Sequence, residues 1–208
     1  MARSKQSSIR WRQRQDRDPY VERAEREGWR SRAVFKLDQI EQREHILKRG
    51  RVCVDLGAAP GGWCQLAARR LGPEGRIIAI DLLKMDPIEG VEFIQADFMT
   101  DEALAQLRAL LNGRSVDLVI SDMAPNISGN PSIDLPRSMG LAEAALMFAE
   151  EVLRPNGDFL VKLFQGEGFP EFVDSVRGQF ETTKLIKPKA SRPASREIYL
   201  LARKYRML

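Results

Sequence analysis

Short, almost continuously apolar runs recur along the chain from residue 51 onward. Several are rich in β-branched residues and carry Asp at or near their ends, as in VCVDLG and VDLVISD. Such runs are typical of strands that are covered on both faces within a parallel sheet. The pattern predicts strands over the following ranges, of which 180–188 is the weakest: 51–57, 76–82, 91–97, 116–122, 158–164, 180–188 and 197–205.

The segments between these runs carry apolar residues at helical spacing, as Val34, Leu37 and Ile40 do before the first strand. Alternating strands and helices predict one doubly wound, Rossmann-like α/β domain with a mostly parallel, seven-stranded sheet and helices on both faces. The last two strands are joined by KPKASRPASR, so we expect a hairpin and an antiparallel edge strand. The predicted helices are 31–45, 61–71, 101–112, 136–153 and 169–179.

The composition fits one domain with a sizeable core, since the chain has 208 residues of which 43% are hydrophobic. No run approaches the roughly 20 apolar residues of a membrane span. The first residues, MARSKQSSIRWRQR, lack the apolar stretch of a secretory signal, so we expect a cytosolic protein. Two cysteines and one histidine are too few for a disulfide framework or a metal cluster, and we expect no metal.

Basic charge gathers at both ends of the chain. Residues 1–32 hold ten Lys/Arg and five Asp/Glu, and residues 184–208 hold eight and one, whereas 33–183 hold 15 and 23. Aromatic residues such as Trp11, Tyr20 and Tyr199 are interleaved with these basic ends. Basic segments with aromatics suit a nucleic-acid partner, although solvated chain ends have the same composition. We expect 1–19 to be a basic, flexible arm and 20–208 to be the domain.

A glycine-rich turn follows the first strand, in VDLGAAPGGW. In an open α/β sheet, this is where ligands bind, beyond the carboxyl ends of the strands. The turn matches neither the GxGxxG pattern of dinucleotide sites nor the GK[ST] ending of a phosphate loop. We therefore favour a ligand without phosphates, such as S-adenosylmethionine, and place Gly61 and Trp63 beside it. The Trp63 ring has an equally ordinary place in the core.

Four predicted strands in succession end in an aspartate. Asp81 is placed to take ribose hydroxyls, and Asp97 to accept from an adenine amino group. One such Asp alone is often a helix cap or a turn former. Four such residues at successive strand ends favour a ligand site. They are Asp55, Asp81, Asp97 and Asp122.

The sequence resembles the FtsJ-type family of methyltransferases over nearly its whole length, from about residue 20 to the end. The motifs that carry the resemblance are RSRAVFKLDQI, VDLGAAPGGW, DLLKMDPI, SDMAPNISG, VKLFQGEGF and SRPASREIYL. It implies transfer of a methyl group from S-adenosylmethionine, with S-adenosylhomocysteine as product. The implied acceptor is a ribose 2′-hydroxyl, of a uridine, in 23S ribosomal RNA of the large (50S) subunit. A monomer is the default expectation.

Four charged residues match the family's Lys–Asp–Lys–Glu tetrad, namely Lys36, Asp122, Lys162 and Glu197. Lys162 interrupts the apolar run FLVKLF, where desolvation favours a neutral amine that can accept a proton. It could equally extend its amine to solvent. The resemblance makes Lys162 the base or the holder of the attacking oxygen, beside Asp122, which also lies near the methyl donor. It makes Lys36 and Glu197 the groups that orient the hydroxyl.

Three other readings are open. Methyltransferases acting on amino groups of DNA bases carry an [ND]PP[YF]-like loop after the fourth strand, and DMAPN at 122–126 differs from it. An RNA-binding or ribosome-assembly factor with a vestigial cofactor fold is disfavoured by the intact glycine turn. A nicotinamide dehydrogenase is disfavoured by the missing GxGxxG.

Overall fold

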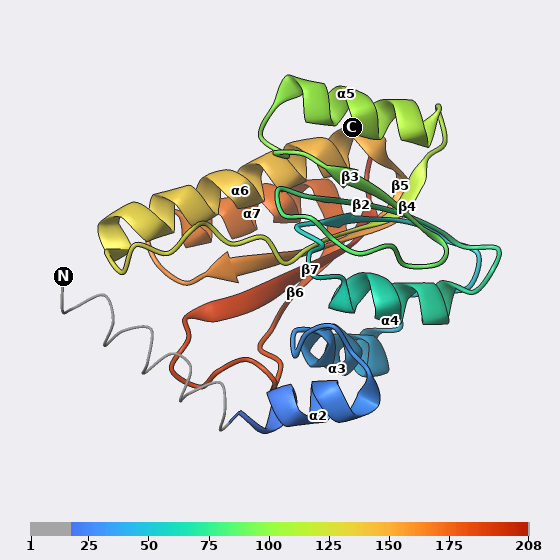
Figure 1. Cartoon of the computed structure of the whole chain (residues 1–208). Coiled ribbons are helices and arrows are strands. Elements are labelled where there is room, and N and C mark those ends of the chain that lie inside the picture. Colours follow the sequence, from blue (N-terminus) through green and yellow to red (C-terminus); the bar gives the residue numbers. More distant parts are fainter. Residues whose placement is uncertain (1–17, 208) are drawn as a thin grey trace.

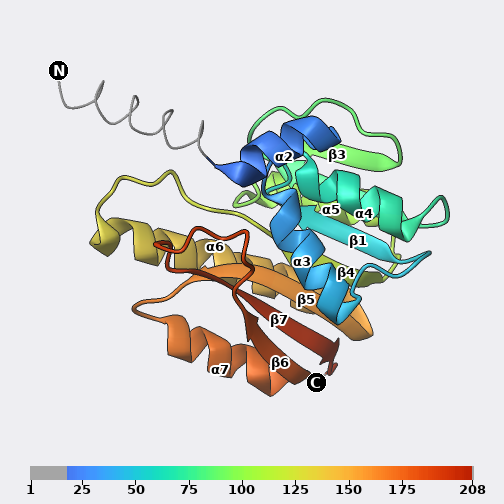
Figure 2. The same cartoon turned by 90° about the horizontal axis from the view of Figure 1, so that it is seen from below.

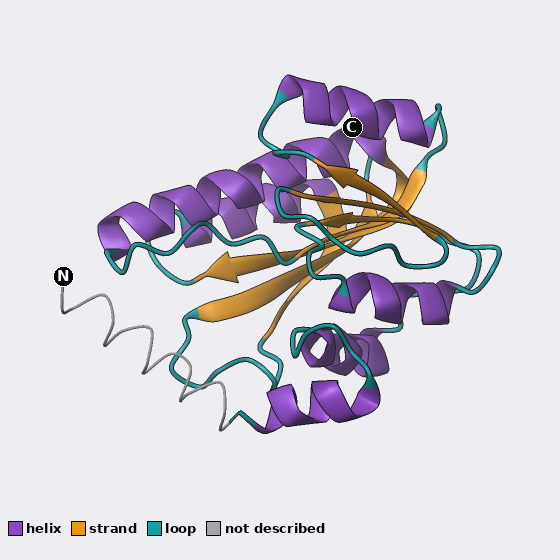
Figure 3. Ribbon diagram, viewed as in Figure 1, coloured by secondary structure: helices purple, strands orange, loops and turns teal. Residues whose placement is uncertain are grey.

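The computed structural model describes residues 18–207. A twisted sheet forms the middle layer, and helices cover both of its faces (Figures 1 and 3). The helices are α2 (Pro19–Glu27), α3 (Val34–Glu44), α4 (Gly62–Leu71), α5 (Asp101–Leu111), α6 (Pro131–Val152) and α7 (Phe169–Gln179). The strands are β1 (Val52–Leu56), β2 (Arg76–Asp81), β3 (Val91–Gln95), β4 (Val116–Ser121), β5 (Leu153–Phe164), β6 (Phe180–Ile186) and β7 (Glu197–Tyr205).

The sheet has the strand order β3-β2-β1-β4-β5-β7-β6. The first five strands in this order are parallel, and β7 runs antiparallel to both β5 and β6. The predicted doubly wound sheet, its seven strands and its antiparallel edge are therefore confirmed. The order reverses between β1 and β4, and this switch point is where open α/β sheets bind ligands.

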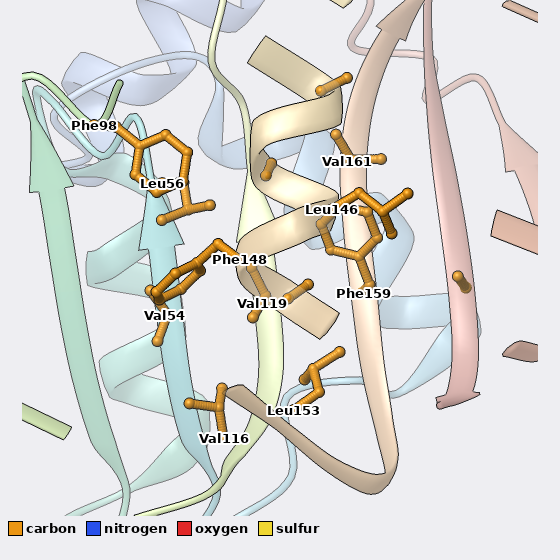
Figure 4. Packing of buried hydrophobic residues seen from close by; sticks show 14 of the residues in the cluster. Val54, Leu56, Phe98, Val116, Val119, Leu146, Phe148, Leu153, Phe159 and Val161 are labelled. Atoms are coloured by element: carbon orange, nitrogen blue, oxygen red, sulfur yellow. The ribbon is translucent and has the colours of Figure 1, made fainter. Parts of the chain in front are cut away.

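Two apolar clusters flank the sheet. One lies between the sheet and α2, α3 and α4, which gather on one face when the molecule is seen from below (Figure 2). The other lies between the sheet and α5, α6 and α7. Figure 4 shows part of it, where Val54, Val119 and Phe159 of the strands meet Leu146 and Phe148 of α6. Both faces bury apolar side chains, which explains why the central strands have no polar alternation.

Helix α2 was not among the predicted elements. Only Ala24 of this helix is buried, and five of its nine residues are charged, so few apolar residues mark it. The start and end of α2 are set by capping residues instead. The Asp18 side chain accepts from the amide of Tyr20, and Gly28 closes the helix with a φ of 72°. Residues 1–17 of the expected N-terminal arm lie outside the described residues.

Most element boundaries differ from the predicted ones by a few residues, and two starts differ by five. Helix α6 begins at Pro131 rather than 136, because Asn130 caps it and Pro136 lies inside it. Strand β5 begins at Leu153 rather than 158, because Leu153 pairs with Val116 before an irregularity shifts the register. Across residues 18–207, no helix is both long enough and apolar enough to span a bilayer.

Candidate active site

The turn after β1 and the segment after β4 touch at the switch point. Gly57 has a φ of 82°, and a Cβ built on it would lie 2.5 Å from Cγ of Met123 and 3.1 Å from its Cα. A side chain here would collide with the backbone that follows Asp122, and the φ is one that L-residues rarely adopt. Glycine at this position therefore allows the turn to lie against Asp122.

Gly61 brings a second segment against the turn. Its φ is 107°, and an added Cβ would lie 2.7 Å from Cδ1 of Ile88 and 2.9 Å from Sδ of Met85. Arg30 bridges the same two segments, because its guanidinium donates to the carbonyl oxygens of Pro60 (3.4 Å) and Asp86 (2.6 Å). Helix α4 starts at the next residue, and the first amides of a helix have no acceptor within it. The turn is therefore held in place by these contacts, and it leads into backbone amides of α4 that can donate to a ligand.

Asp81 and Asp97 lie at successive strand ends, as expected from the sequence. Asp81 ends β2, and its two carboxylate oxygens accept from the amides of Ala59 (2.9 Å) and Leu83 (2.7 Å). Each carboxylate oxygen has a second lone pair, so Asp81 retains capacity for a hydroxyl donor. Asp97 is exposed two residues beyond β3, and its Oδ1 accepts from the amide of Met99 (3.0 Å).

The Trp63 ring belongs to the core. The side chain is buried, its indole Nε1 donates to the carbonyl of Ala33 (2.8 Å), and its ring lies 5.8 Å from that of Tyr199. These contacts join α4 to α3 and β7. The backbone amide of Trp63, in the first turn of α4, remains the part that can meet a ligand.

Asp55 is a buried acid. It is one of the four strand-end aspartates predicted from the sequence, but no part of a ligand was assigned to it. Its Oδ2 accepts from the Cys64 thiol (3.1 Å), while its Oδ1 has no partner in the part of the chain that the structure describes. Burial raises the pKa of Asp55 to about 7, the Cys64 hydrogen bond opposes this, and the nearby charges of Asp122 and Asp81 add to it. The site thus holds an unsatisfied acceptor close to the switch point.

The structure brings the four tetrad residues together as two ion pairs. Lys162 Nζ lies 2.9 Å from Asp122 Oδ1 and also donates to the Asp122 carbonyl. The amine is therefore held inside the site rather than extended to solvent. Lys36 Nζ lies 2.8 Å from Oε1 and 2.9 Å from Oε2 of Glu197.

Strand register explains why these residues meet. Lys162 on β5 lies opposite Tyr199 on β7, and Phe164 lies opposite Glu197. Opposed residues of antiparallel strands point to the same face of the sheet, so Lys162 and Glu197 share the face that α3 covers. Lys36 reaches this face from α3, and Asp122 reaches it from the end of β4.

Tyr199 lies between the two pairs. Its hydroxyl donates to Asp122 Oδ1 (2.7 Å), and its ring centroid is 5.8 Å from Lys36 Nζ. Burial, and then the charge of Asp122, raise the pKa of Tyr199, so the phenol remains a donor. Burial alone would also raise the pKa of Asp122. The positive charges of Lys162 and Lys36, with the Tyr199 hydrogen bond, outweigh it and lower that pKa, so Asp122 is ionised.

These contacts fit a cationic ligand that also carries hydroxyl groups. Asp55 offers an unsatisfied buried oxygen, Asp81 and Asp97 offer carboxylates, and α4 offers amides. Within residues 18–207, no group of three or more His, Cys, Asp and Glu side chains is arranged to hold a metal ion.

Three polar side chains around the site were not among the predicted site residues: Arg30, Ser191 and Tyr199. Ser191 donates to Glu197 Oε1 (2.7 Å); it opens the SRPASREIYL motif, but nothing in the motif shows that its side chain contacts Glu197. Tyr199 could have been found from the strand pattern, since it stands two residues from Glu197 on the same face.

The sheet order, the turn at the switch point and the strand-end acids define a Rossmann-like α/β protein with one polar site at the carboxyl edge of its sheet. The FtsJ-like methyltransferase family model matches residues 29–205. The chain belongs to the FtsJ-like methyltransferase family, which confirms the resemblance seen in the sequence.

Curated relatives cover almost the whole chain. A protein of Halorhodospira halophila named ribosomal RNA large subunit methyltransferase E is 55% identical over 192 residues, which are 92% of this chain and 91% of that protein. A protein of the same name from Hydrogenovibrio crunogenus is 50% identical over 203 residues, 98% of each chain.

Solved structures share the fold. A Plasmodium falciparum protein described as a ribosomal RNA methyltransferase has a TM-score of 0.77 at 30% identity, over 85% of this chain and 98% of that one. Human methyltransferase-like protein 13, solved in complex with SAH, has a TM-score of 0.57 at 13% identity, over 83% of this chain and 80% of that one. The second likeness shows the fold alone.

Proposed function

We propose that this protein transfers a methyl group from S-adenosylmethionine to the 2′-hydroxyl of a uridine in 23S ribosomal RNA of the 50S subunit. The observation that carries the proposal is the pair of neighbouring ion pairs, Lys36–Glu197 and Lys162–Asp122, at the carboxyl edge of the sheet. The four residues match the tetrad that the sequence resemblance implies. The names of the curated relatives support ribosomal RNA of the large subunit as the substrate.

The methyl donor would lie between the glycine turn and the strand-end acids. Asp81 would take the ribose hydroxyls, Asp97 the adenine amino group, and the amides at Gly61 and Trp63 the remaining polar groups. Asp122 would face the sulfonium end. S-adenosylmethionine supplies the activated methyl group. The protein contributes acceptors that match a cation and a diol.

The contacts of Lys162 favour a positioning role. A lysine ammonium has three donors, and Asp122 takes two of them in this structure. The third would hold the attacking ribose oxygen in line with the methyl group. Such positioning is worth up to roughly 7–11 kcal/mol of an activation barrier. The hydroxyl becomes strongly acidic only as the C–O bond forms, so the ionised Asp122 carboxylate suffices as proton acceptor.

An RNA partner is supported by the loop that precedes β7, which we call the basic loop (187–196). The loop ends at Glu197, and its four cationic side chains are exposed: Lys187, Lys189, Arg192 and Arg196. Phosphates on this loop would bring an RNA strand to the tetrad.

The deciding experiment maps ribose methylation of 23S RNA from cells with and without the protein. We expect one 2′-O-methyluridine to disappear from cells that lack it. In vitro, 50S particles from those cells should accept labelled methyl groups, and a 2′-deoxy substitution at the mapped nucleotide should abolish transfer. Methylation that survives the 2′-deoxy substitution would move the acceptor to a base.

A further inference from the structure

Glu197 is held by two different parts of the protein. Lys36 contacts both carboxylate oxygens from α3, at 2.8 and 2.9 Å. Ser191, in the basic loop, donates through its hydroxyl to Oε1 at 2.7 Å. Both Ser191 and Glu197 are buried, with 4% and 9% of their surface exposed. The carboxylate therefore has a second donor, Ser191, that the tetrad does not include.

Ser191 is itself fixed by α3 and the residues just before it. Its amide donates to Pro188 O (2.9 Å), closing a turn. The neighbouring Ala190 donates its amide to the Gln39 side chain (3.0 Å), and its carbonyl accepts from Arg32 (2.6 Å). Gln39 lies on α3, the helix that carries Lys36. The turn that carries Ser191 is therefore held by the same helix as Lys36.

A carboxylate held only by a flexible lysine can swing with that side chain, since Lys has four rotatable bonds and makes a point contact. A short serine on an anchored turn has little such freedom. It fixes the direction in which the carboxylate presents its second oxygen, and so the position of the Lys36 ammonium. Lys36 in turn contributes to the charge that keeps Asp122 ionised.

We propose that Ser191 is a positioning residue for methyl transfer, acting through its hydrogen bond to Glu197 to align Lys36 with the substrate hydroxyl. This inference rests on the proposed function. Ser191 contacts neither cofactor nor the reacting oxygen. Its loss should therefore lower kcat while the KM values for RNA and for S-adenosylmethionine stay unchanged.

The test compares S191A with S175A, a serine-to-alanine control at an exposed position of α7, on the other face of the sheet. We expect S191A to lose about tenfold to a hundredfold in kcat, the scale of small misalignments in an active site. S175A should keep the wild-type kcat, and S191T, which restores a hydroxyl, should recover most of the loss.

A double-mutant cycle with E197A separates positioning from a general loss of stability. If Ser191 acts through Glu197, S191A should have no further effect on kcat in the E197A protein. Equal fold-losses in both backgrounds would overturn the proposal, and so would a wild-type kcat in S191A. If S191T proves to have a lowered Tm and cannot serve as the restored variant, this cycle still tests whether Ser191 acts through Glu197.

The two proposals fail in different ways. If the wild-type protein transfers no methyl group to 50S particles, the proposed function fails before any variant is compared. If the wild type is active and S191A equals it, only the role of Ser191 is overturned.

Discussion

At the scale of single residues, the site depends on charges that are each buried beside an opposite charge. Lys162 is 8% exposed and Lys36 is 8% exposed, and neither would be tolerated there without its carboxylate. Removing one member of a pair leaves the other as a buried, uncompensated charge. Variants at this site must therefore be assessed for folding before their turnover is interpreted.

Replacing Lys162 should separate turnover from cofactor binding. We expect K162A to lose about 10²-fold or more in kcat, because the group that holds the attacking oxygen is gone. The Kd for S-adenosylmethionine, measured by calorimetry, should remain near that of the wild type. The control is K184A, which removes an exposed lysine paired with Glu44. A K162A protein that no longer binds the cofactor would contradict the assignment.

Replacing Asp81 should weaken cofactor binding and leave turnover largely intact, the reverse of the effect expected for Lys162. The variant D81N keeps the shape of the side chain but loses a charged acceptor for the ribose hydroxyls. We expect the Kd for S-adenosylmethionine to weaken by about 10- to 100-fold, the usual loss for a hydrogen bond to a charged group. At saturating cofactor, kcat should be largely retained. A matched change at the exposed Asp174, D174N, should leave both quantities unaltered.

Asp55 gives a prediction for stability against pH. Its pKa of about 7 lies above the value of an unfolded chain, so between about pH 4 and 7 the folded state holds a proton that the unfolded state has lost. The contribution of Asp55 to stability must therefore fall as pH rises through this window, by on the order of 1 kcal/mol per pH unit. Urea unfolding of D55N should show a gain over wild type at pH 8 that shrinks towards pH 4. A pH-independent difference would contradict the assigned pKa.

At the scale of elements, the glycine turn shows how local backbone geometry supports the site. Gly61 and Gly113 both have positive φ, of 107° and 73°. A Cβ at Gly61 would meet Ile88 and Met85, whereas nothing lies within 4 Å of one at Gly113. An alanine at Gly113 would therefore cause backbone strain alone, whereas an alanine at Gly61 would cause backbone strain and a steric clash.

We expect G113A to cost about 1–2 kcal/mol of stability through backbone strain alone. G61A should cost more, and it should also weaken binding of S-adenosylmethionine, because the 82–88 segment must move away from the turn. Thermal unfolding and calorimetry check both statements. Equal effects of the two substitutions on cofactor affinity would show that the turn makes no contact with the cofactor.

Elements with strong local patterns could be predicted from the sequence, and those without could not. All seven strands were predicted because both faces of the central ones are buried. Helix α2 was missed because it buries a single residue, and α6 was started late because Pro136 is tolerated inside it.

In the site, each charged residue could be named from its motif, but the pairing could not. Lys36 and Glu197 are 161 positions apart, and only the strand order and register bring them together. Ser191 reaches Glu197 from a loop, and this contact leaves no mark in a local pattern, whereas the strand alternation does place Tyr199 on the face of Glu197.

At the scale of the whole molecule, the basic loop and the acidic central part of the chain predict how RNA binding responds to salt. The double variant K189A/R196A removes two exposed cations without touching an ion pair of the described residues. We expect weaker binding to 50S particles and a slope of log K against log salt that is smaller by about 1–2. R177A, on α7 at the other face of the sheet, should leave the slope unchanged. An unchanged slope in the double variant would place the RNA elsewhere.

The position of β7 has a consequence for the order in which the protein is made. This strand is synthesised last, yet it lies between β5 and β6, and β6 pairs with no other strand. A growing chain that has left the ribosome up to residue 190 already contains the glycine turn and all four strand-end acids, but it lacks Glu197 and Tyr199. The nascent protein can thus assemble its proposed cofactor side first. Only the emergence of β7 completes the sheet and the proposed tetrad, so a nascent chain that ends before Glu197 cannot yet carry out the proposed reaction.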